Sequence, residues 1–528
     1  MARVSHALAR VGAAALLSTA MLAAGAPAPG APAVGRGAAP LTPPMGMMTW
    51  QKFRCNGPGA NGPLDDCTDA DTTYCISHAL IVGQAAAMAR GGFVAAGYNL
   101  ASIDDCWMSG RSEITHELTA SAYFPNASLA ATAAAVHAHG MLLGTYTAES
   151  PVTCCGHAAS AGYEAVDAAT FARWGVDYLK ADGCYAANVS YYAVGYPLMG
   201  RALQESGRAI TFSCSWPDYE MCDVMHDCGN VSVVDWPAVV AAGCSQWRVW
   251  RDIDCTSASL FEIIDHFGDY APLMAPIHGP GRWFDADQLL IGAGCLTPDE
   301  ERAQLALWAV LAQPLIVSAD FRNMSAASAA VLLNEAAIAI DQDALGAMGR
   351  RLGPAAAPAQ VWARRLANGD VAVALLNRHG APAPCGAWEV NHTGYLECKG
   401  GCCEPFSNLT LAEAEAACCA LGAECAGLSF PAAAAASGAR DSGCFKAALD
   451  SFQPSVAFVG ASRAPWPPPA PPGALDIGLN FTDVGLPADA RVDVFDVWAG
   501  ASAGVFEGAF VARGVAYHAA AFFRLAVL

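Results

Sequence analysis

The sequence predicts an α/β protein, a (β/α)8 TIM barrel followed by a C-terminal antiparallel β-sandwich domain that carries a Cys-rich insertion. In residues 41–346 short β-like runs alternate with amphipathic helical runs, and eight such alternations in about 300 residues are typical of a βα-barrel. From residue 347 the helical spacing gives way to alternating β patterns. An open doubly wound sheet is the alternative, but the chain lacks the glycine-rich phosphate turn that usually accompanies one.

The barrel region contains candidate strands at Gly46–Trp50, Tyr98–Asp104, Met141–Thr147, Val176–Ala181, Ala209–Ser215, Gln246–Asp252, Pro272–Ile277 and Pro314–Ala319. Helical spacing occurs at Ala127–His139, Asp167–Trp174, Ser257–Phe267, Pro298–Leu311 and Ala326–Ile340. In a βα-barrel the C-terminal ends of the strands meet on one face, so polar residues at those ends are candidates for chemistry.

The C-terminal β domain is expected in two pieces, residues 347–380 and 473–528. In the first piece, Val361–Leu366 and Asp370–Leu376 predict a hairpin that turns at Asn368-Gly369. The second piece is β-rich from Ile477 onward, with alternation in Arg491–Trp498. The two pieces together predict one sandwich.

Residues 381–472 between these pieces have a different composition. They contain eight cysteines and end in the proline-rich run Pro465–Pro472, which predicts a small disulfide-stapled module with a semi-rigid exit linker. The module resembles apple/PAN domains, with a helix expected at Leu411–Cys418 and strands at Cys425–Phe430 and Gly443–Lys446. Such modules bind proteins or glycans; a stapled surface decoration without a ligand is the alternative.

The N-terminal residues and the cysteine content predict export. Residues 1–26 read as a signal peptide and 27–40 as a Pro/Ala/Gly-rich leader, because the apolar run Val11–Ala24 is too short to span a bilayer. Twenty-one cysteines and seven Asn-x-Ser/Thr sequons fit an oxidising, glycosylating compartment. The net charge of -20 argues against nucleic acid or an anionic membrane as partner. We expect the secretory pathway, with the medium, a lysosome or a vacuole as destination.

Two predicted strands end in carboxylates. Val176–Cys184 carries Lys180 and Asp182 at its end, and the strand beginning at Gln246 leads to Asp252. Either motif alone is more simply a strand cap or an ion pair. Two strand-end acids in one barrel fit retaining glycoside hydrolysis, in which one attacks the anomeric carbon and the other donates and then accepts a proton.

Several motifs follow one another in a familiar order: Thr42–Gly46, Trp50 with Cys55-Asn56, Ile103–Trp107, Lys180–Cys184, Ser213–Pro217, Trp247-Arg248 with Asp252, and Gly279–Trp283. In these motifs, over residues 41–380 and 474–528, the chain resembles glycoside hydrolase family 27, the α-galactosidases and α-N-acetylgalactosaminidases. The resemblance implies a barrel followed by a β-sandwich and a retaining exo-glycosidase without cofactor. A homodimer is a further expectation.

Carried over by position, the resemblance implies that Asp182 is the nucleophile and Asp252 the acid/base. Lys180 should favour the ionised form of Asp182, and Arg251 should point away from Asp252 because successive strand residues face opposite sides. What raises the pKa of Asp252 for its acid role is not visible in the sequence. The implied sugar-binding residues are Trp50, Asp104, Asp105, Tyr146, Cys154, Lys180, Cys184, Ser215, Asp218, Tyr219, Arg248 and Asp287.

Asp104 and Asp105 resemble the pair that binds the 4- and 6-hydroxyls of galactose, and Trp50 the residue that stacks on the sugar. A Ca²⁺ or Mg²⁺ site on the two adjacent acids is the alternative, but oxygen-rich metal loops usually space their ligands at alternate positions, so no metal is expected. The resemblance also implies the disulfides Cys55–Cys106, Cys67–Cys75, Cys154–Cys184 and Cys214–Cys244. Cys222 and Cys228 suggest a local clasp, Cys255–Cys295 is one option, and Cys155 is left over.

The segment Ser213–Tyr219 departs from both branches of the family. In the α-galactosidase branch a glutamate stands at the position of Ser215 and a bulky residue at that of Asp218. The N-acetylgalactosaminidase branch has serine and alanine there, which leave room for an acetamido group. Terminal α-D-galactosides are therefore the main substrate prediction and α-N-acetylgalactosaminides the alternative. A β-L-arabinopyranoside is a third reading, and an inactive secreted glycan-binding protein a remote one.

Overall fold

The computed structural model describes residues 39–55, 74–186, 188–378 and 474–528, together with the backbone of five strands within 388–463. The predicted signal peptide and leader, Cys67, the helix expected at 411–418 and the proline-rich run lie outside the described residues.

Eight parallel strands form one sheet in the order β10-β1-β2-β5-β6-β7-β8-β9. They are β1 (Met45–Met48), β2 (Leu100–Ser102), β5 (Leu142–Ala148), β6 (Tyr178–Asp182), β7 (Thr211–Cys214), β8 (Gln246–Arg248), β9 (Trp283–Asp285) and β10 (Leu315–Val317). The two ends of the sheet meet where Leu289, just after β9, pairs with Val317 of β10, which closes the ring. The predicted (β/α)8 barrel is confirmed.

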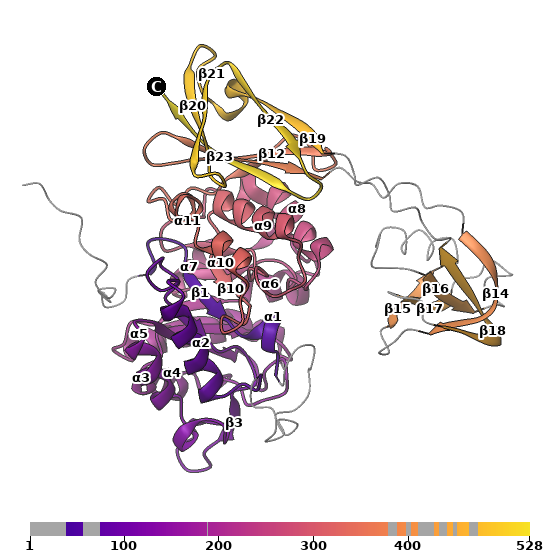
Figure 1. Cartoon of the computed structure of the whole chain (residues 1–528). Helices are drawn as coiled ribbons and strands as arrows, with labels where there is room; N and C mark the ends of the chain where they lie inside the picture. The colour runs from indigo at the N-terminus through magenta and orange to yellow at the C-terminus, as the bar shows by residue number, and fades with distance from the viewer. Residues whose placement is uncertain are drawn as a thin grey trace, which may run out of the picture. The chain divides into compact units, whose positions relative to one another are not determined.

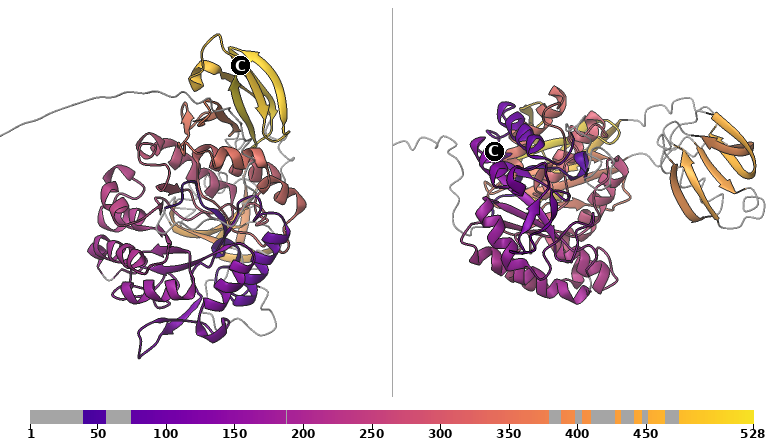
Figure 2. Two further views of the ribbon diagram at one scale, coloured as in Figure 1. Left: turned by 90° about the vertical axis from the view of Figure 1, so that its left-hand side faces the viewer. Right: turned by 90° about the horizontal axis from the view of Figure 1, so that it is seen from below.

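Helices lie outside the strands of the barrel (Figures 1 and 2). The main ones are α2 (His78–Arg90), α3 (Ala130–Ala138), α4 (Glu164–Trp174), α5 (Tyr192–Glu205), α7 (Trp236–Ala241), α8 (Ser257–Met274), α9 (Pro298–Leu311), α10 (Ala326–Leu332) and α11 (Glu335–Asp341). α9 begins where the sequence predicts, because Thr297 and Glu300 form a reciprocal capping box. None of the helices in the described ranges is long and apolar enough to cross a bilayer.

The predicted strand Pro272–Ile277 is wrong. Residues 272–274 are the end of α8, whose buried residues recur at helical spacing up to Ala271 and Met274, and residues 275–277 form a turn. The seventh barrel strand is β9 instead. The apolar end of an amphipathic helix resembles a short buried strand, and length is the usual arbiter between them. The helix expected at Ala326–Ile340 is also interrupted, because the Asn334 side chain accepts from the N–H of Ala337 and starts a new helix.

The C-terminal domain contains a six-stranded antiparallel sheet in the order β11-β12-β13-β23-β20-β21 and a two-stranded ladder, β19-β22. The strands are β11 (Arg350–Leu352), β12 (Ala359–Arg365), β13 (Val371–Asn377), β19 (Leu475–Asn480), β20 (Arg491–Asp496), β21 (Ala501–Glu507), β22 (Ala509–Val515) and β23 (Ala520–Val527). Residues of both sheets share one apolar core. The predicted hairpin forms with Arg365 opposite Val371, and Gly369 supplies the left-handed turn conformation at φ +91°.

The C-terminal domain packs against α9, which is buried on nearly all sides. Arg364 of β12 is 2% exposed and donates hydrogen bonds to the carbonyl oxygens of Ala309 and Ile340, both at 2.8 Å. These carbonyls lie at the C-terminal ends of α9 and α11, where backbone acceptors lack helical partners. Arg364 Nη1 therefore links the β-sandwich to the ends of two barrel helices.

The insertion contains a five-stranded sheet in the order β14-β18-β16-β17-β15. Its strands are β14 (Trp388–Glu397), β15 (Cys403–Leu409), β16 (Gly427–Pro431), β17 (Asp441–Lys446) and β18 (Ser451–Arg463). β16 and β17 cover the two strands that the sequence predicts in this segment, shifted by two residues at their starts.

We expect the buried His278 to make the stability of the barrel sensitive to acid. Its ring packs against Trp283 and Phe284, Nδ1 accepts the N–H of Phe284 at 3.3 Å, and burial lowers its pKa from 6.5 to about 3. An unfolded histidine is protonated below about pH 6.5, so the contribution of neutral His278 to stability is full above that pH and is lost as the pH falls. Each pH unit below 6.5 should cost about 1 kcal/mol.

We expect His278→Gln, which keeps an acceptor but does not titrate, to be destabilised at pH 7.5 and to lose less stability than wild type between pH 6.5 and 4.5. Unfolding by urea at a series of pH values measures this difference. Parallel stability curves for the two proteins would show that His278 does not carry the pH dependence.

Candidate active site

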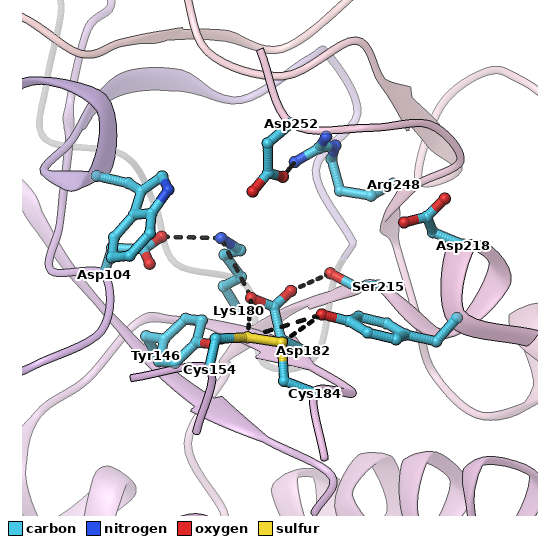
Figure 3. Close-up of a pocket in the computed structure, with 12 residues that line it drawn as sticks. Asp104, Tyr146, Cys154, Lys180, Asp182, Cys184, Ser215, Asp218, Arg248 and Asp252 are labelled. Carbon is cyan, nitrogen blue, oxygen red and sulfur yellow. Dashed lines mark hydrogen bonds and ion pairs between the residues drawn. A yellow bond between two sulfur atoms is a disulfide. The ribbon is translucent and has the colours of Figure 1, made fainter. Parts of the chain in front are cut away.

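A cavity of about 140 Å³ lies at the C-terminal ends of the barrel strands (Figure 3). Both predicted catalytic acids and ten of the predicted sugar-binding residues line it: Trp50, Asp104, Tyr146, Cys154, Lys180, Asp182, Cys184, Ser215, Asp218, Tyr219, Arg248 and Asp252. They come from segments far apart in the chain, which the closed barrel brings to one face.

Lys180 and Asp182 lie two residues apart on β6 and therefore share a face of the strand. The Lys180 Nζ lies 2.9 Å from Asp104 Oδ2 and 3.6 Å from Asp182 Oδ2. Burial acts to lower the Lys180 pKa, but the surrounding carboxylates of Asp104, Asp182 and Asp252 raise it well above its ordinary value. The lysine stays protonated, so its positive charge lies beside the Asp182 carboxyl group.

The other side of Asp182 faces β7 and the disulfide. The Ser215 hydroxyl donates a hydrogen bond to Asp182 Oδ1, and the Cys154–Cys184 disulfide lies beside it (Figure 3). Tyr219 approaches the disulfide, with its hydroxyl 2.8 Å from Cys184 Sγ. The next residue must be glycine, because a Cβ on Gly183 would lie 2.8 Å from the Tyr219 ring.

The sequence predicts that this strand continues to Asp252, but β8 ends at Arg248. The Arg248 guanidinium donates to the carbonyl oxygens of Trp250 at 2.9 Å and Arg251 at 2.7 Å, and these bonds turn the chain out of the strand. Asp252 consequently lies on a loop, with its carboxylate 3.0 Å from Arg248 Nη1. Arg251 points away as expected and pairs with Glu262 of α8 at 3.2 Å.

The charges around Asp252 determine the direction of its pKa shift, which the sequence does not reveal. Desolvation acts to raise its pKa, but the positive charges of Arg248 and Lys180 outweigh it, and the pKa is lowered from its ordinary value. In the substrate-free protein Asp252 is therefore a carboxylate. An acid role for Asp252 would require an acidic medium or a substrate that separates it from Arg248.

Asp105 and Asp287 do not line the cavity but support its wall. Asp105 is 1% exposed and accepts the backbone N–H groups of Cys106 at 2.7 Å and Cys155 at 3.0 Å. Asp287 accepts the N–H of Ile253 at 2.7 Å and pairs with Arg248 at 3.2 Å. Burial raises the pKa of Asp287 to about 6, although Arg248 opposes the shift.

Two supporting contacts were not predicted. The Thr49 hydroxyl oxygen accepts the backbone N–H of Asp104 at 2.9 Å, and the Arg54 guanidinium lies 4.8 Å from the centre of the Trp50 ring. The second contact has a sequence signal, because Arg54 follows Trp50 by four residues and neighbours it on a helical turn. Nothing in the sequence indicates the first.

Five disulfides join described cysteines: Cys55–Cys106, Cys154–Cys184, Cys214–Cys244, Cys222–Cys228 and Cys255–Cys295. Cys67, the partner expected for Cys75, lies outside the described residues. Within the described ranges Cys155 is a free thiol, with its Sγ 3.3 Å from Cys55 Sγ.

Comparison with known proteins agrees with this architecture. The family model described as Alpha galactosidase A matches residues 42–343, and that of the Alpha galactosidase C-terminal beta sandwich domain matches 356–396. Human alpha-N-acetylgalactosaminidase is 39% identical over 328 residues, 62% of this chain and 75% of the relative. Human alpha-galactosidase A is 37% identical over 350 residues, 65% and 76% of the two chains.

The chain belongs to glycoside hydrolase family 27. It is a glycoside hydrolase of the α-galactosidase type. Solved structures share the fold: alpha-galactosidase I of Mortierella vinacea has a TM-score of 0.63 at 22% identity, covering 93% of this chain and 98% of its own. A family 27 β-L-arabinopyranosidase of Geobacillus stearothermophilus has a TM-score of 0.58 at 16% identity, covering 92% and 96%. The disulfides of this family 27 chain are consistent with the secretory pathway.

The Arg248–Asp252 ion pair predicts the pH profile of this family 27 hydrolase. If Asp252 acts as the acid, kcat/KM falls on the basic side as Asp252 loses its proton. Arg248→Met removes the neighbouring charge, so the pKa of Asp252 should rise and the basic limb should move to higher pH, although overall activity falls. Arg251→Met is the matched control, because Arg251 pairs with Glu262 and should leave the limb in place. A basic limb that is identical in wild type and Arg248→Met contradicts the assignment.

Proposed function

We propose that this family 27 hydrolase is a retaining exo-glycosidase that removes terminal non-reducing α-D-galactose-type sugars, with α-D-galactosides as its main substrates. The observation that carries the proposal is the single cavity into which Asp182 and Asp252 both project, with Lys180 beside the first and Arg248 beside the second. Its volume of about 140 Å³ is below the roughly 300–1,000 Å³ typical of drug-sized ligands. That volume fits one terminal sugar ring better than an internal stretch of glycan.

In the proposed reaction Asp182 attacks the anomeric carbon, while Asp252 protonates the departing glycosidic oxygen. Water then hydrolyses the glycosyl-enzyme, and Asp252 removes its proton. Asp104 accepts hydrogen bonds from sugar hydroxyls and Lys180 donates to them, which fixes the ring, while Trp50 covers its apolar face. Asp105 and Asp287 act indirectly, through the wall and through Arg248.

A specific observation favours α-N-acetylgalactosaminides as a second candidate substrate. Ser215 is small and belongs to the cavity wall, and a human relative at 39% identity is named alpha-N-acetylgalactosaminidase. Against it, Asp218 adds a carboxylate to the same wall, and burying a carboxylate beside a methyl group is costly.

The compartment and the insertion complete the proposal. We infer that the enzyme works outside the cell or in a lysosome or vacuole, because its disulfides fit an oxidising export route. We also infer that the inserted module contributes a glycan or protein ligand site.

Hydrolysis of p-nitrophenyl α-D-galactoside at mildly acidic pH tests the function, with p-nitrophenyl α-N-acetylgalactosaminide measured in parallel. Proton NMR of the first-formed sugar tests the mechanism, because a retaining enzyme releases the α-anomer before mutarotation. Release of the β-anomer would contradict the two-step mechanism. Failure to turn over either glycoside, with sugar binding intact, would favour a glycan-binding role.

A further inference from the structure

The Asp218 carboxylate lacks a partner in the cavity wall. Asp218 lies on the short helix α6 (Trp216–Tyr219), lines the cavity and points toward it (Figure 3). Among the described residues, no hydrogen bond or ion pair is made by its carboxylate. The nearby Arg248 guanidinium is already shared between Asp252 and Asp287, and Lys180 between Asp104 and Asp182. A carboxylate so placed is costly unless a ligand satisfies it.

Ser215, which precedes α6 in the same wall, is restricted in the hydrogen bonds that it can form with a ligand. Its hydroxyl proton is donated to Asp182 Oδ1, so toward a sugar Ser215 can only accept a hydrogen bond. Ser215 and Asp218 therefore present two acceptors and no donor. A single ligand atom that donates to both of them must carry at least two hydrogens.

The position of these acceptors identifies the sugar atom that they face. Ser215 contacts the nucleophile, which attacks C1, so the group beside Ser215 is bonded to C1 or lies next to it. The two ring neighbours of C1 are the ring oxygen and C2. The ring oxygen carries no hydrogen and gains positive charge in the transition state. The glycosidic oxygen on C1 also carries no hydrogen, and it departs from the side opposite to Asp182, so acceptors beside Ser215 can serve only the substituent on C2.

We propose that the terminal sugar cleaved at this site carries a free, protonated amino group at C2, and that Asp218 is the counter-ion that selects such α-D-galactosaminides. A 2-hydroxyl or an acetamido N–H offers one hydrogen, whereas an ammonium group offers three and can bond Asp218 and Ser215 together. The inference rests on the proposed function for the reaction and for the galactose-type ring, and it replaces the 2-hydroxyl of the α-D-galactosides named there by an ammonium group.

The charges around the cavity agree with a cationic ligand. Asp104, Asp182, Asp218 and Asp252 line it, against Lys180 and Arg248. Burial raises the pKa of Asp218 to about 6; Arg248 opposes the shift, and the charges of Asp252, Asp182 and Asp223 add to it. By analogy with an α-amino group, whose pKa is about 8, the sugar amine is protonated in mildly acidic solution, and its charge would in turn favour ionised Asp218.

The chemistry at C1 stays that of the proposed function. An Asp182 oxygen forms a bond to C1 as the C1–O bond breaks, and the leaving oxygen takes the proton of Asp252. Water then replaces Asp182 at C1 and gives its proton to Asp252. The 2-ammonium group keeps its three hydrogens throughout and only binds.

The test compares kcat/KM for the p-nitrophenyl α-glycosides of galactosamine, galactose and N-acetylgalactosamine. Wild type should prefer the galactosaminide, and Asp218→Asn should lower the galactosaminide-to-galactoside ratio by about 30-fold or more, since one partner of an enclosed charge pair is removed. Asp227→Asn is the matched control: its exposed carboxylate accepts from the Asn230 side-chain amide at 2.6 Å, and the ratio should not change.

Three results would overturn the proposal: an unchanged ratio in Asp218→Asn, a wild-type preference for the N-acetyl sugar, or a larger loss toward the galactoside than toward the galactosaminide. Hydrolysis of none of the three glycosides would instead refute the proposed function. In that case calorimetric titration of wild type and Asp218→Asn with galactosamine and galactose still decides the role of Asp218. Tighter galactosamine binding that depends on Asp218 supports it, and equal binding of the two sugars overturns it.

Discussion

Asp182→Asn should lower kcat/KM for p-nitrophenyl α-D-galactoside by at least about 10³-fold, which corresponds to about 4 kcal/mol of lost transition-state stabilisation. Asparagine has the shape of aspartate and can still accept the Ser215 hydrogen bond, so the cavity should keep its form. It cannot supply the negatively charged oxygen that attacks C1. Steady-state kinetics on the purified full chain measures the effect.

Retained sugar binding separates this prediction from a folding defect. The thermal midpoint of Asp182→Asn should stay within a few degrees of wild type, and galactose should still bind in a calorimetric titration. Substantial residual activity with both properties intact would mean that Asp182 is not the nucleophile. The neighbouring carboxylate Asp104, which pairs with Lys180 at 2.9 Å, would then be the group to examine next.

Asp252→Ala should have the second largest effect, and its size should depend on the leaving group. p-Nitrophenolate leaves without an acid, so formation of the glycosyl-enzyme should persist while its hydrolysis loses the base and slows by about 10²–10⁴-fold. A burst of p-nitrophenol equal to the enzyme concentration should precede a slow steady state. A methyl glycoside, which needs protonation, should show no burst.

Azide and mass spectrometry sharpen this second test. Azide is an anionic nucleophile that needs no base, so it should restore turnover of the nitrophenyl substrate by Asp252→Ala. The glycosyl-enzyme that accumulates should carry the sugar on the peptide containing Asp182. Asp254→Ala is the control, because that side chain is 74% exposed and pairs only loosely with Arg54 at 3.9 Å. Equal losses for both leaving groups would assign the acid elsewhere.

The sequence predicts the barrel and most of the residues that line the cavity, because both depend on where the strands end. Lys180 and Asp182 end a strand of clear apolar periodicity, and the closure of the ring then brings such ends together. The seventh strand is misplaced although β9 is no shorter than β2, β8 and β10, which lie within predicted strands. The apolar C-terminal half of α8 gives a stronger local signal than β9 does.

The electrostatics of the cavity could not be predicted from the chain. The low pKa of Asp252 depends on Arg248 folding back over the loop carbonyls of Trp250 and Arg251, a turn that periodicity does not reveal. The unpaired state of Asp218 likewise follows from the fact that Arg248 and Lys180 bind other carboxylates. Contacts of this kind are decided by three-dimensional competition among charges.

The point at which the insertion enters the C-terminal sheet has a consequence for chain entropy. β13 ends at Asn377 and pairs with β23, while the chain resumes its sandwich strands only at Leu475. Because the entropy of closing a loop grows only with the logarithm of its length, a tenfold longer connection costs about 2 kcal/mol. A module that folds on its own holds part of the connection compact and reduces even this amount. The C-terminal domain therefore accommodates an inserted module between β13 and β19 for a free energy of about 2 kcal/mol, similar to what one large buried side chain contributes.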